Sequence, residues 1–78
     1  MIDISNKQGG ITLLLGEKLK SSRVKKKYSQ NDVAEQLHIS RQSISKWEND
    51  ISYPDLDNLV KLSTYYQVSI DHLLKEKP

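Results

Sequence analysis

The chain has 78 residues, a formal net charge of +2 and no cysteine. A chain of this length forms one domain with a small core, so a large internal cofactor cavity is not expected. The lack of cysteine excludes disulfides, thiolate metal sites and a cysteine nucleophile. No apolar run reaches the roughly 20 residues of a membrane span, and the N-terminus does not have the form of a signal peptide. We therefore expect a cytoplasmic protein with no membrane partner.

The charges are unevenly distributed along the chain. Residues 17–49 contain eight basic and four acidic residues, whereas residues 51–78 contain three basic and four acidic ones. Such asymmetry is typical of a protein with one face toward nucleic acid, and an ordinary solvated charge pattern explains it equally well.

The N-terminal part of the chain predicts an arm followed by a helix. Residues 1–10 are polar, end in two glycines and show no periodicity, as in a flexible arm. Ile11, Leu15 and Leu19 then recur at four-residue spacing and predict a first helix to about Lys26. The arm can be disordered, prolong the helix, pair with a second chain or reach a groove. We divide the chain into an arm (1–13), a folded helical domain (14–74) and a C-terminal tail (75–78).

Two short helices are predicted next, with a tight turn between them. Ser29, with Asp32 three residues later, has the form of a capping box and predicts a helix start. Ser40 is expected to cap the following helix, in which Ile44 and Trp47 face inward. The inward residues of the earlier helix are Val33, Ala34 and Leu37.

The remainder of the chain predicts two further helices. Pro54 and Asp55 mark a loop and a helix cap. Ser69 is expected to cap a last short helix. The apolar residues of these two helices are Leu56, Leu59, Val60, Leu62, Ile70, Leu73 and Leu74. The sequence thus predicts an all-α fold, a compact five-helix bundle.

The third predicted helix carries polar side chains away from its apolar side. They are Arg41, Gln42, Ser43, Ser45 and Lys46. Such side chains donate hydrogen bonds to phosphates and base edges, and a helix fits the DNA major groove. Gln pairs in bidentate fashion with adenine, and Arg or Lys suits guanine. A DNA-reading helix is the leading hypothesis, against the alternative of an exposed polar face.

Several sequence motifs at matching spacings along the chain extend this hypothesis. The stretches SRQSISKWEND and SYPDLDNL, with the closing VSIDHLL, resemble the Xre type of helix-turn-helix domain, shared by the lambda-like phage repressors and Cro proteins. The similarity runs from about Gly16 to Leu74. The resemblance implies a five-helix bundle whose third helix, about Ser40 to Asn49, enters the major groove. It also implies a dimer on a two-fold symmetric operator.

The resemblance assigns roles by position. It places Arg41, Gln42, Ser43 and Lys46 at the bases, and Gln30, Ser40, Ser45 and Asn49 at phosphates. Arg41 is equally plausible as a phosphate anchor. The resemblance further implies a buried ion pair between Arg23 and Glu48, for which a guanidinium is well suited.

The chain departs from this family at several positions. Where the first four helices often end in glycine, it has Lys27, His38, Asp50 and Gln67. A left-handed backbone costs roughly 1 kcal/mol or more for Lys or Gln, so either these turns differ or they are strained. Ile51 stands where many relatives have a phosphate-binding lysine, and Ser22 where a core leucine is common.

The sequence therefore predicts a sequence-specific regulator of transcription, a repressor that acts as a homodimer on double-stranded DNA. Dimer contacts are expected through the C-terminal helices or the N-terminal arm. The alternative of another class is a protein-interaction module, such as an antitoxin or an anti-repressor. Duplex affinity and its salt dependence separate the two.

Neither metal binding nor catalysis is expected from the sequence. His38 and His72 are too few for a metal site, and neither a nucleophile elbow nor a phosphate-binding glycine loop is present, so we predict no enzyme activity. No cofactor or small-molecule ligand is predicted. The four tyrosines can form stacking surfaces for single-stranded nucleic acid. The favoured interpretation places Tyr28 and Tyr66 in the bundle, with Tyr53 and Tyr65 partly exposed.

Overall fold

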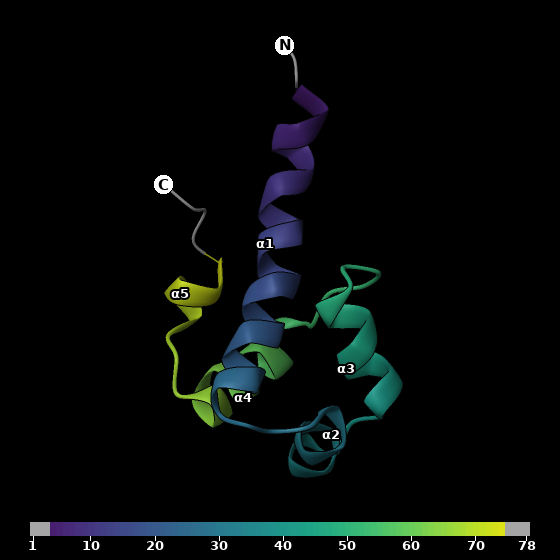
Figure 1. Ribbon diagram of the computed structural model, residues 1–78, viewed down its shortest axis with the longest axis vertical. Helices are drawn as coiled ribbons and strands as arrows, with labels where there is room; N and C mark the ends of the chain where they lie inside the picture. The colour runs from purple at the N-terminus through teal and green to yellow at the C-terminus, as the bar shows by residue number, and fades with distance from the viewer. Residues whose placement is uncertain (1–3, 75–78) are drawn as a thin grey trace.

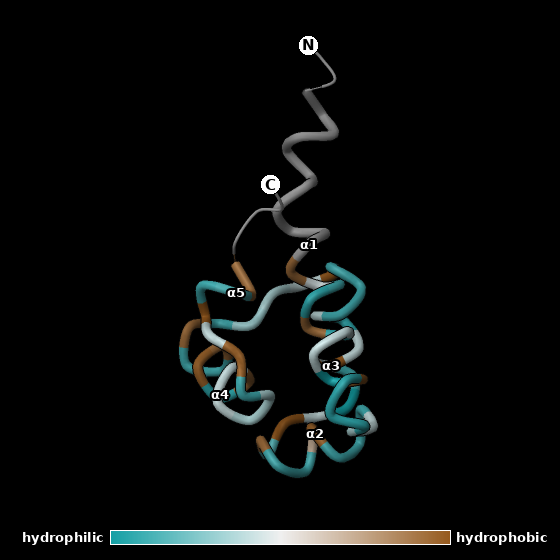
Figure 2. The backbone as a smooth tube through the Cα atoms, turned by 60° about the vertical axis from the view of Figure 1, so that its left-hand side comes forward, coloured by the Kyte–Doolittle hydropathy of each residue, from teal (hydrophilic) through white to brown (hydrophobic). Residues whose placement is uncertain are grey.

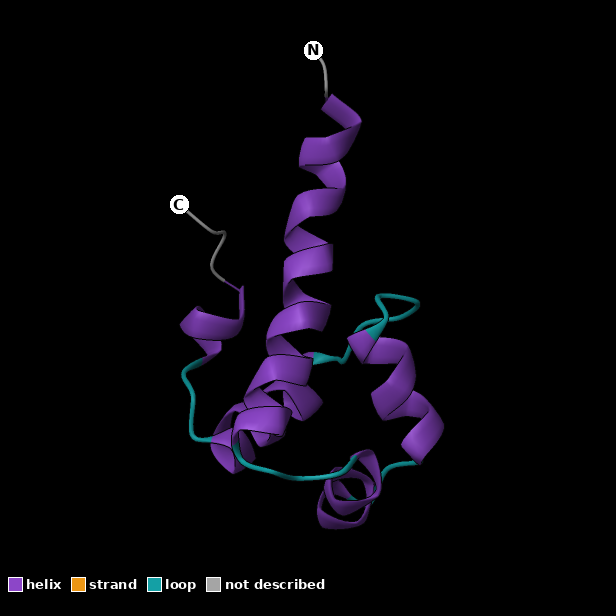
Figure 3. Ribbon diagram, in the orientation of Figure 1, coloured by secondary structure: helices purple, strands orange, loops and turns teal. Residues whose placement is uncertain are grey.

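The computed structural model describes the backbone of residues 4–74 and the side chains of residues 15–74. Five helices follow one another: α1 (Ile4–Lys25), α2 (Gln30–Leu37), α3 (Arg41–Glu48), α4 (Leu56–Tyr66) and α5 (Ile70–Leu74) (Figure 1). Loops join them, and residues 4–74 contain no strand (Figure 3). No helix in this part of the chain is long and apolar enough to cross a membrane. The predicted all-α bundle of five helices is confirmed.

The start of α1 differs from the sequence prediction. The periodicity placed the helix start near Ile11, whereas the backbone is helical from Ile4, as in the alternative in which the arm prolongs the first helix. Two successive glycines lower helix stability by roughly 1 kcal/mol each relative to alanine, yet they do not break the backbone hydrogen bonds of a long helix. Residues 1–3 and the predicted tail at 75–78 lie outside the described residues.

Side-chain caps begin the later helices at the predicted positions. Ser29 Oγ accepts from the Asp32 amide, and Asp32 accepts from the Ser29 amide, which completes a capping box at α2. Ser40 Oγ accepts from the Ser43 amide at α3. Asp55 and Ser69 make the same contact at α4 and α5. Each cap satisfies a backbone donor that the first turn leaves free, so these helix starts are encoded locally.

The core lies where α1 packs against α3, α4 and α5, and where α2 packs against α3 and α4. Figure 2 shows apolar colour on parts of the described helices. Two apolar residues of α4, Leu56 and Val60, are instead exposed at 71% and 43%. The buried apolar residues are Leu15, Leu19, Val33, Ala34, Leu37, Ile44, Trp47, Leu59, Leu62, Tyr66 and Leu73.

Four helices end in left-handed residues that are not glycine. Lys27, His38, Asp50 and Gln67 have φ angles of 63°, 58°, 59° and 60°. Their turns therefore keep the geometry that glycine normally provides, and the strain suggested by the sequence is present. His38 and Gln67 donate their backbone N–H groups to carbonyls of the preceding turn, which offsets part of that strain.

Candidate nucleic-acid interface

The helix α3 has one anchored side and one exposed side. Its buried residues are Ile44, Trp47 and Glu48. Arg41, Gln42 and Lys46 are exposed, while Ser43 and Ser45 are half-buried. In Figure 2 most of α3 carries hydrophilic colour. The predicted base-reading side chains thus share the solvent side of a short, rigidly anchored helix.

Serine and asparagine side chains form hydrogen bonds at both ends of α3. Ser40 Oγ and Ser43 Oγ lie 3.0 Å apart, in addition to the backbone cap that Ser40 provides. Asn49, the residue that ends α3, donates its side-chain amide to the Ser45 carbonyl at 2.8 Å. These contacts fix the two ends of α3. The DNA contacts predicted for these residues would add to these structural roles.

A buried ion pair joins α1 to α3, as the resemblance implies. Arg23 Nε lies 2.7 Å from Glu48 Oε2, and Arg23 Nη2 lies 3.0 Å from Glu48 Oε1. The two side chains are 11% and 3% exposed. Arg23 also donates to the Tyr28 carbonyl at 2.9 Å. The hydrogen bond with Glu48 raises the pKa of Arg23 above its usual value, so the guanidinium is charged at any relevant pH.

Gln30 connects this buried pair to the exposed side of α3. Gln30 Nε2 donates to Glu48 Oε1 at 3.1 Å. Gln30 Oε1 in turn accepts from Arg41 Nη1 at 3.2 Å. A continuous chain of hydrogen bonds therefore runs from Arg23 in the interior to Arg41 on the surface. The exposed guanidinium is held beside the first turn of α2.

One close contact was missed in the sequence analysis. A Cβ atom placed on Gly16 in α1 would lie 2.6 Å from Asp50 Oδ2 and 2.7 Å from the Glu48 carbonyl oxygen. Only glycine permits this approach between α1 and the end of α3. Burial raises the pKa of Asp50, while its hydrogen bond with the Gly16 backbone opposes the rise. The sequence feature that could have predicted this contact is a glycine inside an otherwise regular helical pattern.

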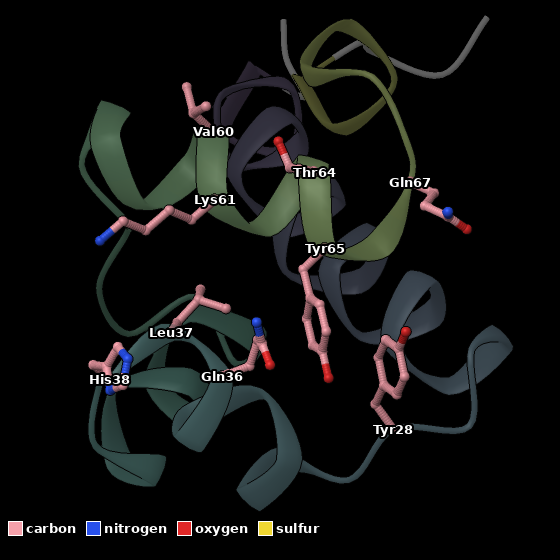
Figure 4. A pocket seen from close by; sticks show the side chains of 9 residues that line it. All are labelled: Tyr28, Gln36, Leu37, His38, Val60, Lys61, Thr64, Tyr65 and Gln67. Carbon is pink, nitrogen blue, oxygen red and sulfur yellow. The ribbon is translucent and has the colours of Figure 1, made fainter.

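The tyrosines pack against one another beside α4. The rings of Tyr28 and Tyr65 are stacked with centroids 4.4 Å apart, and Tyr66 is 1% exposed. Tyr28 and Tyr65 lie at one end of a groove of about 630 Å³ between α2 and α4 (Figure 4). Burial raises the pKa of Tyr66, so its phenol stays neutral near the ion pair. Because the rings of Tyr28 and Tyr65 stack on each other, those faces are not available to nucleic-acid bases.

The two histidines are in different parts of the fold. His38 is the left-handed residue after α2, and His72 lies in α5. Within the described residues, no group of three or more His, Asp or Glu side chains could hold a metal ion. The loop residue Ile51 is 69% exposed, so an apolar side chain stands in solvent beside the end of α3.

Known regulators and repressors are similar to this chain in sequence. The chain is 47% identical over 60 residues to the HTH-type transcriptional regulator ImmR of Bacillus subtilis (strain 168), covering 77% of this chain and 47% of that protein. It is 38% identical over 64 residues to Repressor protein C2 of Salmonella phage P22, covering 82% of this chain and 30% of that protein. The chain thus spans half or less of these two relatives.

The fold matches that of a solved repressor. The P22 c2 repressor protein, in a crystal structure with a synthetic operator, superposes with a TM-score of 0.75 at 35% identity, covering 81% of this chain and 96% of that chain. The hypothetical transcription factor NHTF from Neisseria superposes with a TM-score of 0.77 at 26% identity, covering 85% of this chain and 76% of that chain. The protein family described as Helix-turn-helix matches residues 19–73, from within α1 into α5. The chain belongs to this helix-turn-helix family.

Proposed function

We propose that this chain is a sequence-specific DNA-binding domain of a transcriptional regulator, a repressor that occupies a two-fold symmetric operator. The observation that carries the proposal is the exposed side of α3, where Arg41, Gln42 and Lys46 project from a helix anchored in the core. The relatives support it, because one is named as a regulator, one as a repressor, and a similar structure contains an operator. The function requires binding rather than catalysis, and a cytoplasmic location agrees with it.

In this proposal α3 enters the major groove and reads bases. Gln42 pairs with adenine, while Lys46 and Ser43 contact neighbouring base edges, and each good pair discriminates by about 1 to 3 kcal/mol. Arg41 lies beside Gln30, a position that suits a phosphate as well as a base. The phosphate contacts are Gln30, Ser40, Ser45 and Asn49. Gln30 opens α2, and the free amides of a first helical turn attract a phosphate.

The repressor would act as a homodimer. Two copies of α3 then enter successive major grooves, about 34 Å apart. In α5, Leu73 is 1% exposed and belongs to the core, whereas Leu74 is 47% exposed. Leu74 is therefore the α5 residue that we assign to a dimer contact. Leu74→Asp should lower operator affinity and dimer mass in analytical ultracentrifugation, while the monomer stays folded.

The experiment that tests the proposed function is enrichment of binding sites from a random duplex library by the purified chain near physiological salt. Recovery of a two-fold symmetric motif supports a dimeric operator-binding protein. The affinity for that motif should fall with salt at a log-log slope of about −0.9 per neutralised phosphate. A folded protein that enriches no sequence contradicts the proposal and favours the protein-interaction module.

A further inference from the structure

A hollow of about 470 Å³ lies between α1 and the segment that leads from α4 into α5. One wall is formed by four residues of α1 at spacings of three and four, which is one face of a helix, and by Lys26 directly after it; the α1 residues are Lys18, Ser21, Ser22 and Lys25. The opposite wall includes Val68 and His72. The volume falls within the range of roughly 300 to 1,000 Å³ that is common for small-molecule sites.

Two lysines bridge the hollow. Lys18 Nζ donates to the His72 carbonyl at 2.9 Å, and Lys26 Nζ donates to the side-chain carbonyl of Gln67. Ser22, which is 5% exposed, lies between them in the sequence and lines the hollow. The hollow is therefore bordered by two lysines whose ammonium groups are hydrogen-bonded across it, and it contains a buried serine.

The charge of this site is one-sided. Three lysines line it, and no Asp or Glu of the described chain is among its lining residues. Ammonium groups bind phosphate oxygens through charge-assisted hydrogen bonds, and serine hydroxyls add neutral donors. We propose that this hollow, the α1–α5 anion site, binds a small molecule that carries phosphate groups.

The α1–α5 anion site is separate from the candidate DNA interface. Figure 1 shows α5 and α3 on opposite sides of α1. None of the residues that line the hollow belongs to α2 or α3. The proposal therefore does not rest on the DNA-binding function, and its main test needs no DNA.

The test is a titration of the full chain with inorganic pyrophosphate, followed by amide chemical shifts and by thermal unfolding, against sodium chloride at matched ionic strength. We expect saturable shifts at Lys25, Val68 and His72, together with a rise in Tm, because a ligand of the folded state stabilises it. Shifts that do not saturate, or that sodium chloride reproduces, would show only nonspecific ion binding and overturn the proposal.

Lys25→Gln and Lys20→Gln form a matched pair of variants. Both residues are exposed on α1 and both changes remove one charge, but only Lys25 lines the hollow. Lys25→Gln should weaken pyrophosphate binding about tenfold, and Lys20→Gln should leave it nearly unchanged. Equal losses in the two variants would overturn the proposal.

Ser22→Leu fills the hollow with an apolar side chain and should abolish binding while the protein stays folded. Should this variant unfold, the lysine pair still tests the site. Shifts at the same amides with duplex DNA but none with pyrophosphate would contradict a small-molecule site and assign this face to nucleic acid.

Discussion

Gln30 donates its side-chain amide to Glu48 across 3.1 Å, and this contact fixes which way the Gln30 amide points. The Glu48 carboxylate only accepts hydrogen bonds, so the NH₂ group of Gln30 must face it. Gln30 Oε1 is then turned toward Arg41, 3.2 Å away. A buried carboxylate on α3 thus sets the polarity of an exposed contact at the candidate DNA interface.

The stability losses from substituting Arg23 and Glu48 should be non-additive. Arg23→Met leaves the Glu48 carboxylate buried without its partner and should cost about 3 to 5 kcal/mol of unfolding free energy. Changing both residues to Met should cost clearly less than the sum of the single losses, because no lone charge remains. Urea unfolding of the four proteins measures this cycle. The exposed pair Lys61 and Asp57, 3.6 Å apart, is the control and should give a coupling of about 0.5 kcal/mol or less.

Lys27→Gly should stabilise the domain, although glycine usually weakens a helix. Lys27 has a φ of 63°, a conformation in which Cβ is crowded against the following carbonyl oxygen. Glycine has no Cβ, so the substitution should raise the unfolding free energy by about 1 kcal/mol. Lys20→Gly, the same change within α1, should lower the unfolding free energy by about 1 kcal/mol. Thermal unfolding of both variants compares them directly. Two losses of similar size would mean that residue 27 is not left-handed in solution.

Gly16→Ala should destabilise the fold despite the higher helix propensity of alanine. Its Cβ would lie 2.7 Å from the backbone oxygen of Glu48, so α1 and the end of α3 must move apart. Overpacking of this kind typically costs about 1 to 3 kcal/mol. Ser21→Ala, at an exposed position of the same helix, should change stability by less than about 0.5 kcal/mol. A Gly16→Ala variant as stable as the parent would argue against the close approach.

Asp50→Asn should alter the dependence of stability on pH. Burial raises the folded-state pKa of Asp50, so the protonated side chain stabilises the fold and this contribution is lost as pH rises through the raised pKa. The variant should therefore gain Tm relative to the parent as pH rises from the ordinary Asp pKa through the raised one. Asn also tolerates the φ of 59° at this position. Thermal scans from about pH 3 to about pH 7 cover the window. A Tm difference that does not change with pH would contradict this assignment.

Gln42→Ala and Asn49→Ala should affect DNA binding in different ways. Gln42 is exposed on α3, and its loss should relax base preference at one operator position by about 1 to 3 kcal/mol. Asn49 ends α3, and its loss should weaken binding to all sequences alike. Affinities for an operator and its single-base variants measure both effects. Equal losses across all variants for Gln42→Ala would show that Gln42 does not read a base.

The sequence by itself determined the features that depend on neighbouring residues. The caps at Ser29, Ser40 and Asp55 lie within three residues of the amides that they bind, so residue type and spacing predicted where these helices start. The polar side of α3 followed from helical periodicity in the same way. The pairing of Arg23 with Glu48 was expected only because the chain resembles a family, since the two residues are 25 positions apart.

Only the tertiary structure decided the contacts between distant segments. The position of Gly16 against Asp50 depends on how α1 packs on the end of α3, and no local pattern encodes it. The same holds for Gln30, which reaches Glu48 and Arg41 because α2 and α3 are packed together. The physical reason is that caps and periodicity are satisfied within one helix, whereas packing and buried hydrogen bonds are settled jointly by all helices of the bundle.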